Sequence, residues 1–235
     1  MPTPGLLYVN SRVTSPTLTP SAFDTWYTQE HIPDIFASKG ITSAYRYKAI
    51  DPSALRPYLA LYPVKDLDFL GSEEYMKISV RSEKYFGGRG AFEVAEFDTR
   101  YYEELEGFGK EGGSSELGSL LISVAYSSAP GADNEAAAPY NDEQHQILAN
   151  CPGHIRTRRY KLKESVTGKF LDPQMVVPMY LALHEYDGKS LPQEELTNML
   201  ETEDGERNIE GWRLEEGFED RVGKVAGDGD GMGKV

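Results

Sequence analysis

The sequence predicts an α+β fold in which two βαββαβ units follow one another in a single chain. The first observation is an internal repeat, since residues 26–48 align without a gap to residues 139–161. The second is that the tetrapeptide Tyr-Leu-Ala-Leu at 58–61 recurs at 180–183. The third is that strand-like and helix-like patterns alternate in the same order in both copies. Because the order of the matches is preserved, we expect a tandem duplication.

In the first copy, a helix is expected after an apolar strand. Thr19 can accept a hydrogen bond from free backbone amides, and Pro20 suits the first helical position. Because Pro33 lacks an amide hydrogen, we expect the helix to kink or stop just past His31 and to end before Gly40. The other expected elements are strands at 6–13, 44–50, 58–64 and 92–102 and a second helix at 67–78.

The second copy repeats this plan with a longer loop before its third strand. Its first helix is expected to end before Gly153, and its second helix to follow Pro192. The expected strands are 119–126, 157–163, 179–186 and 212–222, and the second helix is expected at 193–201. We expect a mobile loop at 127–135, which is rich in Ser, Gly and Ala.

The domain organisation follows from these patterns. We assign residues 1–106 to the first repeat, 107–116 to a Gly/Ser linker, 117–225 to the second repeat and 226–235 to a disordered tail. A four-stranded sheet with both helices on one face leaves its other face apolar and exposed. We therefore expect two fused ferredoxin-like repeats packed sheet to sheet as an intramolecular α+β barrel.

Composition excludes several classes of function. The chain has 235 residues and a net charge of -14, which argues against a nucleic-acid or anionic membrane surface. Cys151 is the one cysteine, so the chain has neither an internal disulfide nor a cysteine-based metal site. No apolar run approaches the roughly 20 residues that span a bilayer, and the N-terminus lacks a signal architecture, so a cytoplasmic location is expected.

The stretch from Trp26 to Pro33 carries the chemistry that the sequence suggests. Helical spacing gives a core-facing stripe that starts aromatic and ends titratable: Phe23, Trp26, Tyr27, Glu30 and His31. His31 can act as a general base or acid near neutral pH. Tyr27 lies one turn earlier and can donate a hydrogen bond, while Glu30 can polarise His31 or bind a substrate hydroxyl. The alternative is that Glu30 and His31 are hydrogen-bonded and inert at the rim of the stripe.

The first strand supplies further candidates for substrate binding. Tyr8, Asn10 and Arg12 fall on one face at a period of two residues. If that face lines a pocket on the helix side, Asn10 and Arg12 can hold an enolate or phenolate oxygen. A surface ion pair is the alternative for Arg12. Trp26 and Phe23 complete the expected substrate-binding set.

With the repeat, the Tyr-Leu-Ala-Leu strands and the Trp-Tyr-x-x-Glu-His-x-Pro helix, the sequence resembles the EthD-like branch of the dimeric α+β barrel superfamily. It is most similar to the tandem single-chain EthD-domain proteins of filamentous fungi. The resemblance covers about residues 5–105 and 117–222, and it implies a ligand cavity between each half-sheet and its helices. Gln144 stands where His31 would be and His145 is one position away, so the resemblance implies a single site in the N-terminal half.

These patterns lead to a first hypothesis and its alternatives. We expect a cofactor-independent enzyme of small apolar aromatic or polyketide-type metabolites, catalysing cyclisation, isomerisation or elimination. The alternatives are a non-catalytic hydrophobic-ligand-binding or stress protein, a cofactor-free monooxygenase and a haem enzyme. We expect no metal and no cofactor, although a metal site of histidine and carboxylate stays open as an alternative. The chain has neither a Gly-rich phosphate loop, nor a His-Glu-x-x-His motif, nor a Rossmann fingerprint. The expected partner is a small hydrophobic molecule, and a homodimer of the fused barrel stays open.

Overall fold

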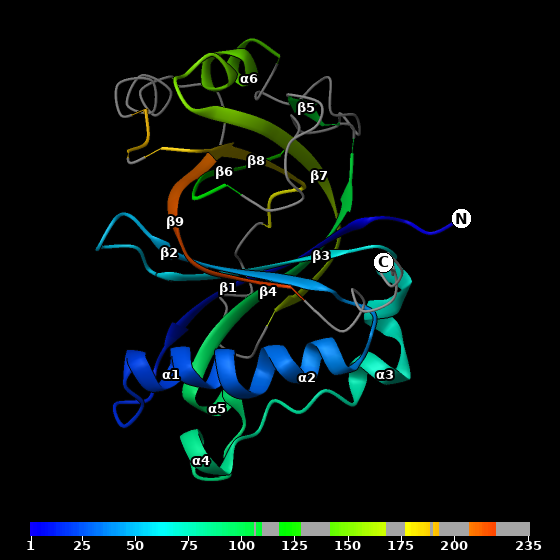
Figure 1. Ribbon diagram of the computed structural model, residues 1–235, viewed down its shortest axis with the longest axis vertical. Coiled ribbons are helices and arrows are strands. Elements are labelled where there is room, and N and C mark those ends of the chain that lie inside the picture. Colours follow the sequence, from blue (N-terminus) through cyan, green and yellow to red (C-terminus); the bar gives the residue numbers. More distant parts are fainter. Residues whose placement is uncertain are drawn as a thin grey trace, which may run out of the picture.

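The strands of the protein close into an antiparallel barrel, with helices on the outer surface (Figure 1). The computed structural model describes residues 1–105, 107–109, 118–127, 142–167, 177–188, 190–192 and 207–219. Within these residues, eight strands form the ring, and the short strand β5 (Phe108–Gly109) pairs with β7 beside it. The expected α+β barrel is therefore confirmed at the level of its architecture.

The elements follow the order that the repeat predicts. The N-terminal half contains four strands: β1 (Gly5–Val13), β2 (Ser43–Ala49), β3 (Tyr58–Val64) and β4 (Ala95–Glu104). Its helical segments are α1 (Pro20–Trp26), η1 (Tyr27–His31), α2 (Ile32–Ala37), η2 (Leu67–Gly71), α3 (Glu73–Met76), α4 (Glu83–Phe86) and α5 (Ala91–Val94). The C-terminal half contains β6 (Leu120–Tyr126), α6 (Asp142–Ala149), β7 (His154–Thr167), β8 (Tyr180–Tyr186) and β9 (Arg207–Glu219).

The two halves have equivalent strand orders and join at both edges. The N-terminal strands run β4-β1-β3-β2 and the C-terminal strands run β9-β6-β8-β7. Hydrogen-bonded pairing of β2 with β9 and of β4 with β7 then closes the ring. Closure removes the open edges that would otherwise expose unpaired backbone groups.

The interior of the barrel is a core shared by both halves. Its buried side chains are mainly tyrosine and leucine, including Leu6, Tyr8, Tyr45, Tyr47, Leu61, Tyr102, Leu121, Tyr160, Leu183 and Trp212. The polar tips that point inward find partners: the Tyr47 hydroxyl donates to the Gly118 carbonyl at 2.8 Å, and the Trp212 indole nitrogen donates to the Ser123 hydroxyl at 2.9 Å. Such pairing limits the cost of burying these groups.

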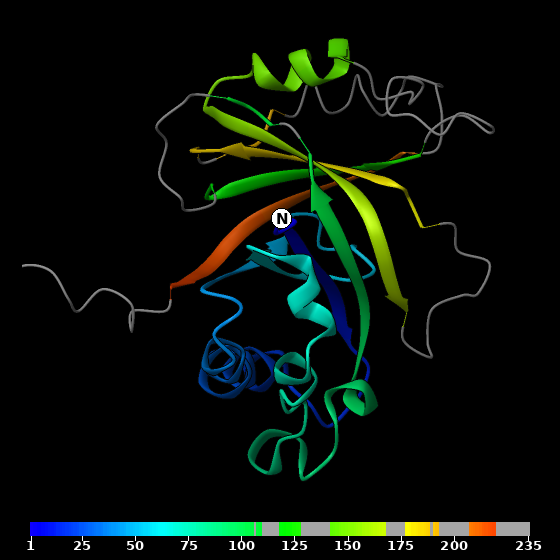
Figure 2. The same ribbon diagram turned by 90° about the vertical axis from the view of Figure 1, so that its right-hand side faces the viewer.

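The outer faces of the two half-sheets carry the helices. The segment from α1 to α2 lies across the N-terminal half-sheet, and α6 lies at the opposite end of the molecule (Figure 2, where the view is turned by 90°). A second buried cluster fills the space between α1, α2 and the N-terminal sheet, with Phe23, Trp26, Ile32 and Ile35 on the helical side. Of the helices in the described part of the chain, none combines the length and apolar character that crossing a bilayer requires.

Several expected boundaries differ from the structure. The expected helix at 67–78 is broken into the 3₁₀ turn η2 and the short helix α3, because Ser72 caps a new helix by accepting a hydrogen bond from the Tyr75 amide. The last strand of the N-terminal half begins at Ala95 instead of Phe92, since residues 91–94 form α5. The expected helix at 193–201, the tail at 226–235, and the expected segments 110–116 and 128–135 lie outside the described residues.

The end of the first helical segment also differs from the expectation. Lys39, and not Gly40, adopts the left-handed backbone conformation, with φ of 65°. Gly40 is required for a different reason, because a Cβ atom there would lie 2.2 Å from the ring of Phe69. The packing of Phe69 against this bare backbone ties η2 to the end of α2.

Substitutions at these adjacent positions should have opposite effects on stability. We expect Gly40→Ala to lower the free energy of unfolding by about 1–3 kcal/mol, because the new methyl group overlaps the Phe69 ring. Lys39→Gly should raise it by about 0.5–1 kcal/mol, because glycine adopts positive φ without steric cost. Urea unfolding followed by circular dichroism measures both. A Gly40→Ala variant as stable as the parent would contradict this account.

Candidate functional site

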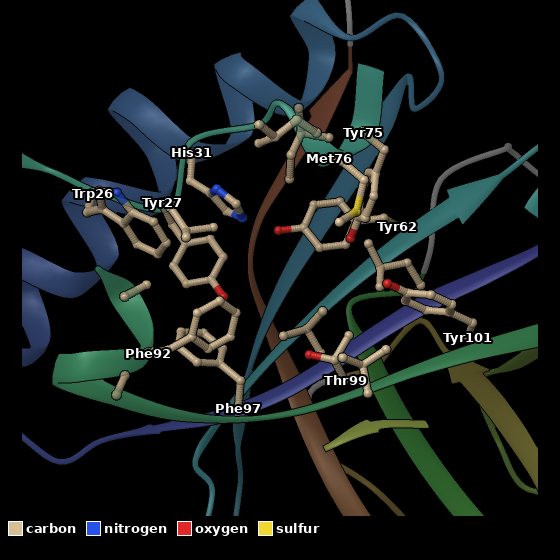
Figure 3. Close-up of a pocket in the computed structure, with 18 of the residues that line it drawn as sticks. Trp26, Tyr27, His31, Tyr62, Tyr75, Met76, Phe92, Phe97, Thr99 and Tyr101 are labelled. Carbon is tan, nitrogen blue, oxygen red and sulfur yellow. The ribbon is translucent and has the colours of Figure 1, made fainter. Parts of the chain in front are cut away.

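A cavity of about 800 Å³ lies between the first helical segment and the N-terminal half-sheet. Its wall is mostly apolar and comes from β1, β3, β4, the helices and the segment around 75–80, as Figure 3 shows. The apolar lining includes Leu7, Val9, Trp26, Ile35, Met76, Ile78, Val80, Phe92, Phe97 and Val166, and the polar lining is Tyr27, His31, Tyr62, Tyr75, Glu93, Thr99 and Tyr101. A concave apolar site of this size with few polar groups suits a small organic ligand.

The helix that borders the cavity changes its geometry at the candidate residues. Thr19 caps α1 by accepting a hydrogen bond from the Ala22 amide, and Pro20 occupies the first turn, as expected. Residues 27–31 then form one π-helical turn, in which the Ile32 amide donates to the Tyr27 carbonyl. The helix neither stops nor breaks at Pro33 but continues to Ala37, because Pro33 lies near the start of α2, where the register has already shifted.

The π turn determines which side chains face the cavity. A π turn holds roughly 4.4 residues, against about 3.6 in an α-helix, so each residue advances by a smaller angle. Tyr27 and His31, four residues apart, stay within about 40° of each other in either geometry, and both line the cavity. Glu30 is turned away and lies near the exposed side chains of Asp34 and Lys84. The expected role of Glu30 beside His31 therefore has no support in the geometry, since Glu30 does not line the cavity.

His31 lies against two aromatic rings. Its ring stacks on Trp26 with a centroid separation of 4.7 Å and an interplanar angle of 15°, and the edge of Tyr27 lies 5.4 Å away. Burial lowers the pKa of His31 to about 4, and the nearby Arg46 cation also lowers it, while an interaction with the backbone of Ser79 raises it. His31 is therefore neutral at physiological pH, the state that a general base requires.

The two nitrogens of His31 have different surroundings. Nδ1 is buried and has no hydrogen-bond partner within the described part of the chain. The nearby backbone of Ser79 favours the charged ring, as a carbonyl acceptor does. The neutral ring carries one hydrogen and one lone pair, so one of its two nitrogens can act as a base. The ring forms part of the cavity wall (Figure 3).

Tyr27 is held on several sides. Burial raises the pKa of Tyr27 to about 12, so its phenol stays protonated, and its hydroxyl forms a hydrogen bond with the side chain of Ser11 on β1. The guanidinium of Arg46 lies 4.1 Å from the centroid of the Tyr27 ring, and Arg46 in turn contacts Asp24 at 2.8 Å. These contacts fit a structural role for Arg46.

Two of the expected aromatic residues have different roles. Trp26 lines the cavity, whereas Phe23 is fully buried behind it and stacks on Trp26 with a centroid separation of 5.9 Å. Phe23 therefore supports the wall of the cavity and does not contribute to its surface. Helical spacing correctly predicted the helix face that turns toward the sheet. It does not distinguish residues that line a cavity, such as Trp26, from residues buried behind them, such as Phe23.

The expected strand residues point the other way. Leu7 and Val9 of β1 line the cavity, so Tyr8, Asn10 and Arg12 face the opposite side of the sheet. Tyr8 packs in the shared core of the barrel, and Asn10 is buried opposite Asp98 on β4. Arg12 pairs with the buried Glu96 at 2.6 Å. A role in this cavity required that their face of β1 line the helix-side pocket. It does not, because neighbouring strand residues alternate between the two faces.

The structure adds site residues that sequence reasoning missed. Tyr62 on β3 contributes a buried phenol, and Tyr75 and Tyr101 form a hydrogen-bonded pair at the cavity wall. On β4, Phe97, Thr99 and Tyr101 follow one another at a period of two and all line the cavity. That period was visible in the sequence, but nothing in it marked which face carried a ligand cavity.

The C-terminal half has a different set of polar residues on its helix side. His145 of α6 and His184 of β8 are buried with ring centroids 5.7 Å apart, and the Thr157 hydroxyl lies between His154 Nε2 at 2.9 Å and His184 Nδ1 at 2.8 Å. In the described ranges, the structure shows no group of three or more His, Cys, Asp or Glu residues that could hold a metal ion.

Comparisons with known proteins support the fold. No protein-family model matches the chain. A curated relative, Core atranone cluster (CAC) protein 1 of Stachybotrys chlorohalonatus, is 27% identical over 192 residues, which cover 78% of this chain and 82% of the relative. An anthrone oxidase-like protein of known structure is 15% identical with a TM-score of 0.57, and the match covers 95% of this chain and 96% of that one.

A second solved structure agrees with the first. A candidate monooxygenase from Fusobacterium nucleatum is 8% identical with a TM-score of 0.51, and the match covers 93% of this chain and 95% of that one. At these identities the likeness shows the fold alone. The chain is thus similar over nearly its whole length to proteins of the dimeric α+β barrel type, with both halves of the barrel in one polypeptide.

The lowered pKa of His31 should make stability depend on pH. Its folded pKa of about 4 lies below the unfolded value of roughly 6.5, so the unfolded chain binds the extra proton first. Stability is therefore lost as the pH falls from about 6.5 towards 4. Between pH 7.5 and 4.5 we expect the parent to lose about 1–3 kcal/mol more than His31→Phe, which keeps the stack on Trp26.

Urea unfolding of both proteins at each pH measures this difference. The acid response of all other groups, including His145 and His184, is common to the two proteins and cancels in the comparison. Equal losses in parent and variant would show that His31 titrates normally.

Proposed function

We propose that the chain is a cofactor-independent enzyme. It removes a proton from one position of a small, largely apolar aromatic or polyketide-type molecule held in the cavity and returns it at another. The observation that carries the proposal is the neutral His31 in the wall of a mostly apolar cavity. A neutral imidazole in this place can accept a proton from a bound molecule. The aromatic side chains that line the cavity support this class of molecule.

In the proposed step, the unprotonated ring nitrogen of His31 removes a proton from a carbon that is next to a carbonyl group or conjugated with it. The electron pair of the broken C–H bond moves to the carbonyl oxygen and forms an enolate, and the imidazolium returns the proton at another position. The low pKa of the free ring makes it a weak base, but the negative charge of the enolate beside the imidazolium favours the charged form as the reaction proceeds. Cyclisation, isomerisation and elimination can all begin with this step.

Tyr27 acts in this proposal as a positioning residue. Its ring lies edge-on to His31, and its hydroxyl is already engaged by Ser11. Tyr27 therefore holds the imidazole between Trp26 and the sheet and does not itself donate to the ligand. The equivalent strand orders of the two halves also support the finer proposal that the chain is a tandem EthD-like protein made of two fused ferredoxin-like repeats.

Deuterium exchange tests the proton transfer directly. Anthrone has an acidic methylene group that is conjugated, through the two fused benzene rings, with the ketone on the opposite side of the central ring, and its size suits the cavity. In anaerobic deuterated buffer, we expect the full chain to accelerate deuterium incorporation into that methylene group by about 10²-fold or more, as measured by mass spectrometry. His31→Gln should lose most of this acceleration, whereas Gln29→Ala, an exposed position on the same π turn, should stay within two-fold of the parent.

The outcomes distinguish the alternatives. A His31→Gln variant with the parent's exchange rate would overturn the proposal. If anthrone binds the parent, as seen by quenching of tryptophan fluorescence, but no exchange is accelerated, the chain is a binding protein. Admitting oxygen to the same assay tests cofactor-free oxygenation, in which anthrone and O₂ give anthraquinone and water, because that reaction begins with the same loss of a proton.

A further inference from the structure

Tyr62 is one of the polar residues of the cavity lining that the proposed mechanism leaves unused. It lies on β3, is 1% exposed, and its hydroxyl has no hydrogen-bond partner within the described residues. The other phenols of the lining are engaged: Tyr27 with Ser11, and Tyr75 with Tyr101. Buried hydroxyl groups are normally paired, so the unpaired phenol of Tyr62 is unexplained by packing, for which phenylalanine would suffice.

The state of the Tyr62 hydroxyl is clear from its surroundings. Burial raises the pKa of Tyr62 well above its ordinary value, so the phenol keeps its hydrogen at any physiological pH. A protonated phenol is a hydrogen-bond donor. Tyr62 therefore offers a donor that no described group of the protein accepts.

The position of Tyr62 relates this donor to His31. The two side chains enter the cavity from different walls, His31 from the helix and Tyr62 from the sheet, as Figure 3 shows. One wall thus provides the lone pair of a neutral imidazole, and the other provides a hydrogen that no described group of the protein accepts. A ligand with a carbonyl oxygen and an adjacent C–H group satisfies both.

The charges of the lining restrict the ligand further. Among the residues that line the cavity, Glu93 carries the one formal charge at neutral pH, and no arginine or lysine is present. A carboxylate or phosphate would lose its hydration here without gaining a cation. The lining is therefore suited to an uncharged molecule.

Resting on the proposed function, we propose that Tyr62 is a catalytic residue that donates a hydrogen bond to the carbonyl oxygen of an uncharged aromatic ketone while His31 removes the adjacent proton. The donor strengthens its hydrogen bond as negative charge develops on that oxygen, which lowers the barrier to forming the enolate. Ketones are then selected over hydrocarbons of the same shape by this single contact.

Two probes of nearly equal shape isolate the contact. 2-Acetylnaphthalene carries a carbonyl group, and 2-ethylnaphthalene has a methylene group in its place. We expect the parent to bind the ketone more tightly than the hydrocarbon in calorimetric titrations. Tyr62→Phe should weaken ketone binding about 5- to 20-fold and change hydrocarbon binding less than two-fold. The control is Tyr58→Phe, on the same strand but outside the cavity lining, which should change neither affinity more than two-fold.

Thermal unfolding separates this role from a structural one. Removing an unpaired buried hydroxyl should leave the melting temperature of Tyr62→Phe equal to or above that of the parent. A lowered melting temperature with unchanged preference for the ketone would assign Tyr62 to packing and overturn the inference. In the anthrone assay, Tyr62→Phe should lower the exchange rate at least ten-fold while His31 stays intact.

The results also separate this inference from the proposed function. If the parent accelerates exchange and Tyr62→Phe keeps both the ketone preference and the exchange rate, the role of Tyr62 is wrong and that of His31 stands. If Tyr62→Phe abolishes the ketone preference but the parent catalyses no exchange, the enzymatic function is wrong and Tyr62 remains the donor to a bound ketone. A parent that binds neither probe would overturn the inference for Tyr62.

Discussion

The closure of the barrel through the β2–β9 and β4–β7 pairs is the constraint on which the rest of the structure depends. It turns the inner faces of both half-sheets toward one shared aromatic core. Only the outer faces remain for helices, so a ligand cavity of the N-terminal half lies between its helix and its sheet. Strand alternation then decides, residue by residue, which side chains can reach a ligand and which stabilise the barrel.

Local sequence signals predicted the parts of the site that depend on neighbouring residues. Thr19 and Pro20 marked the start of the helix, and the 3.6-residue stripe placed Trp26, Tyr27 and His31 on the face toward the sheet. These features are determined within two helical turns, so no knowledge of the tertiary structure was needed.

The remaining parts of the site depend on long-range packing. Strand β1 is buried on both faces, so its pattern of apolar residues does not reveal which face meets the helix, and the condition under which Tyr8, Asn10 and Arg12 were candidates is not met for this cavity. The π turn at 27–31 rotates the following helical residues, and no residue type in the sequence marks its position. Tyr62 is notable because its hydroxyl has no partner among the described residues, which a sequence does not record.

The mouth of the cavity includes Val166 of β7, which pairs with Thr99 across the seam between the halves. A ligand chamber that belongs to the N-terminal half thus takes part of its rim from the other half of the chain. Recombination that exchanged one half for that of a related protein would alter this rim even if every helix-side residue were kept. The two halves are therefore subject to joint selection on what the chamber admits, despite having separate helices.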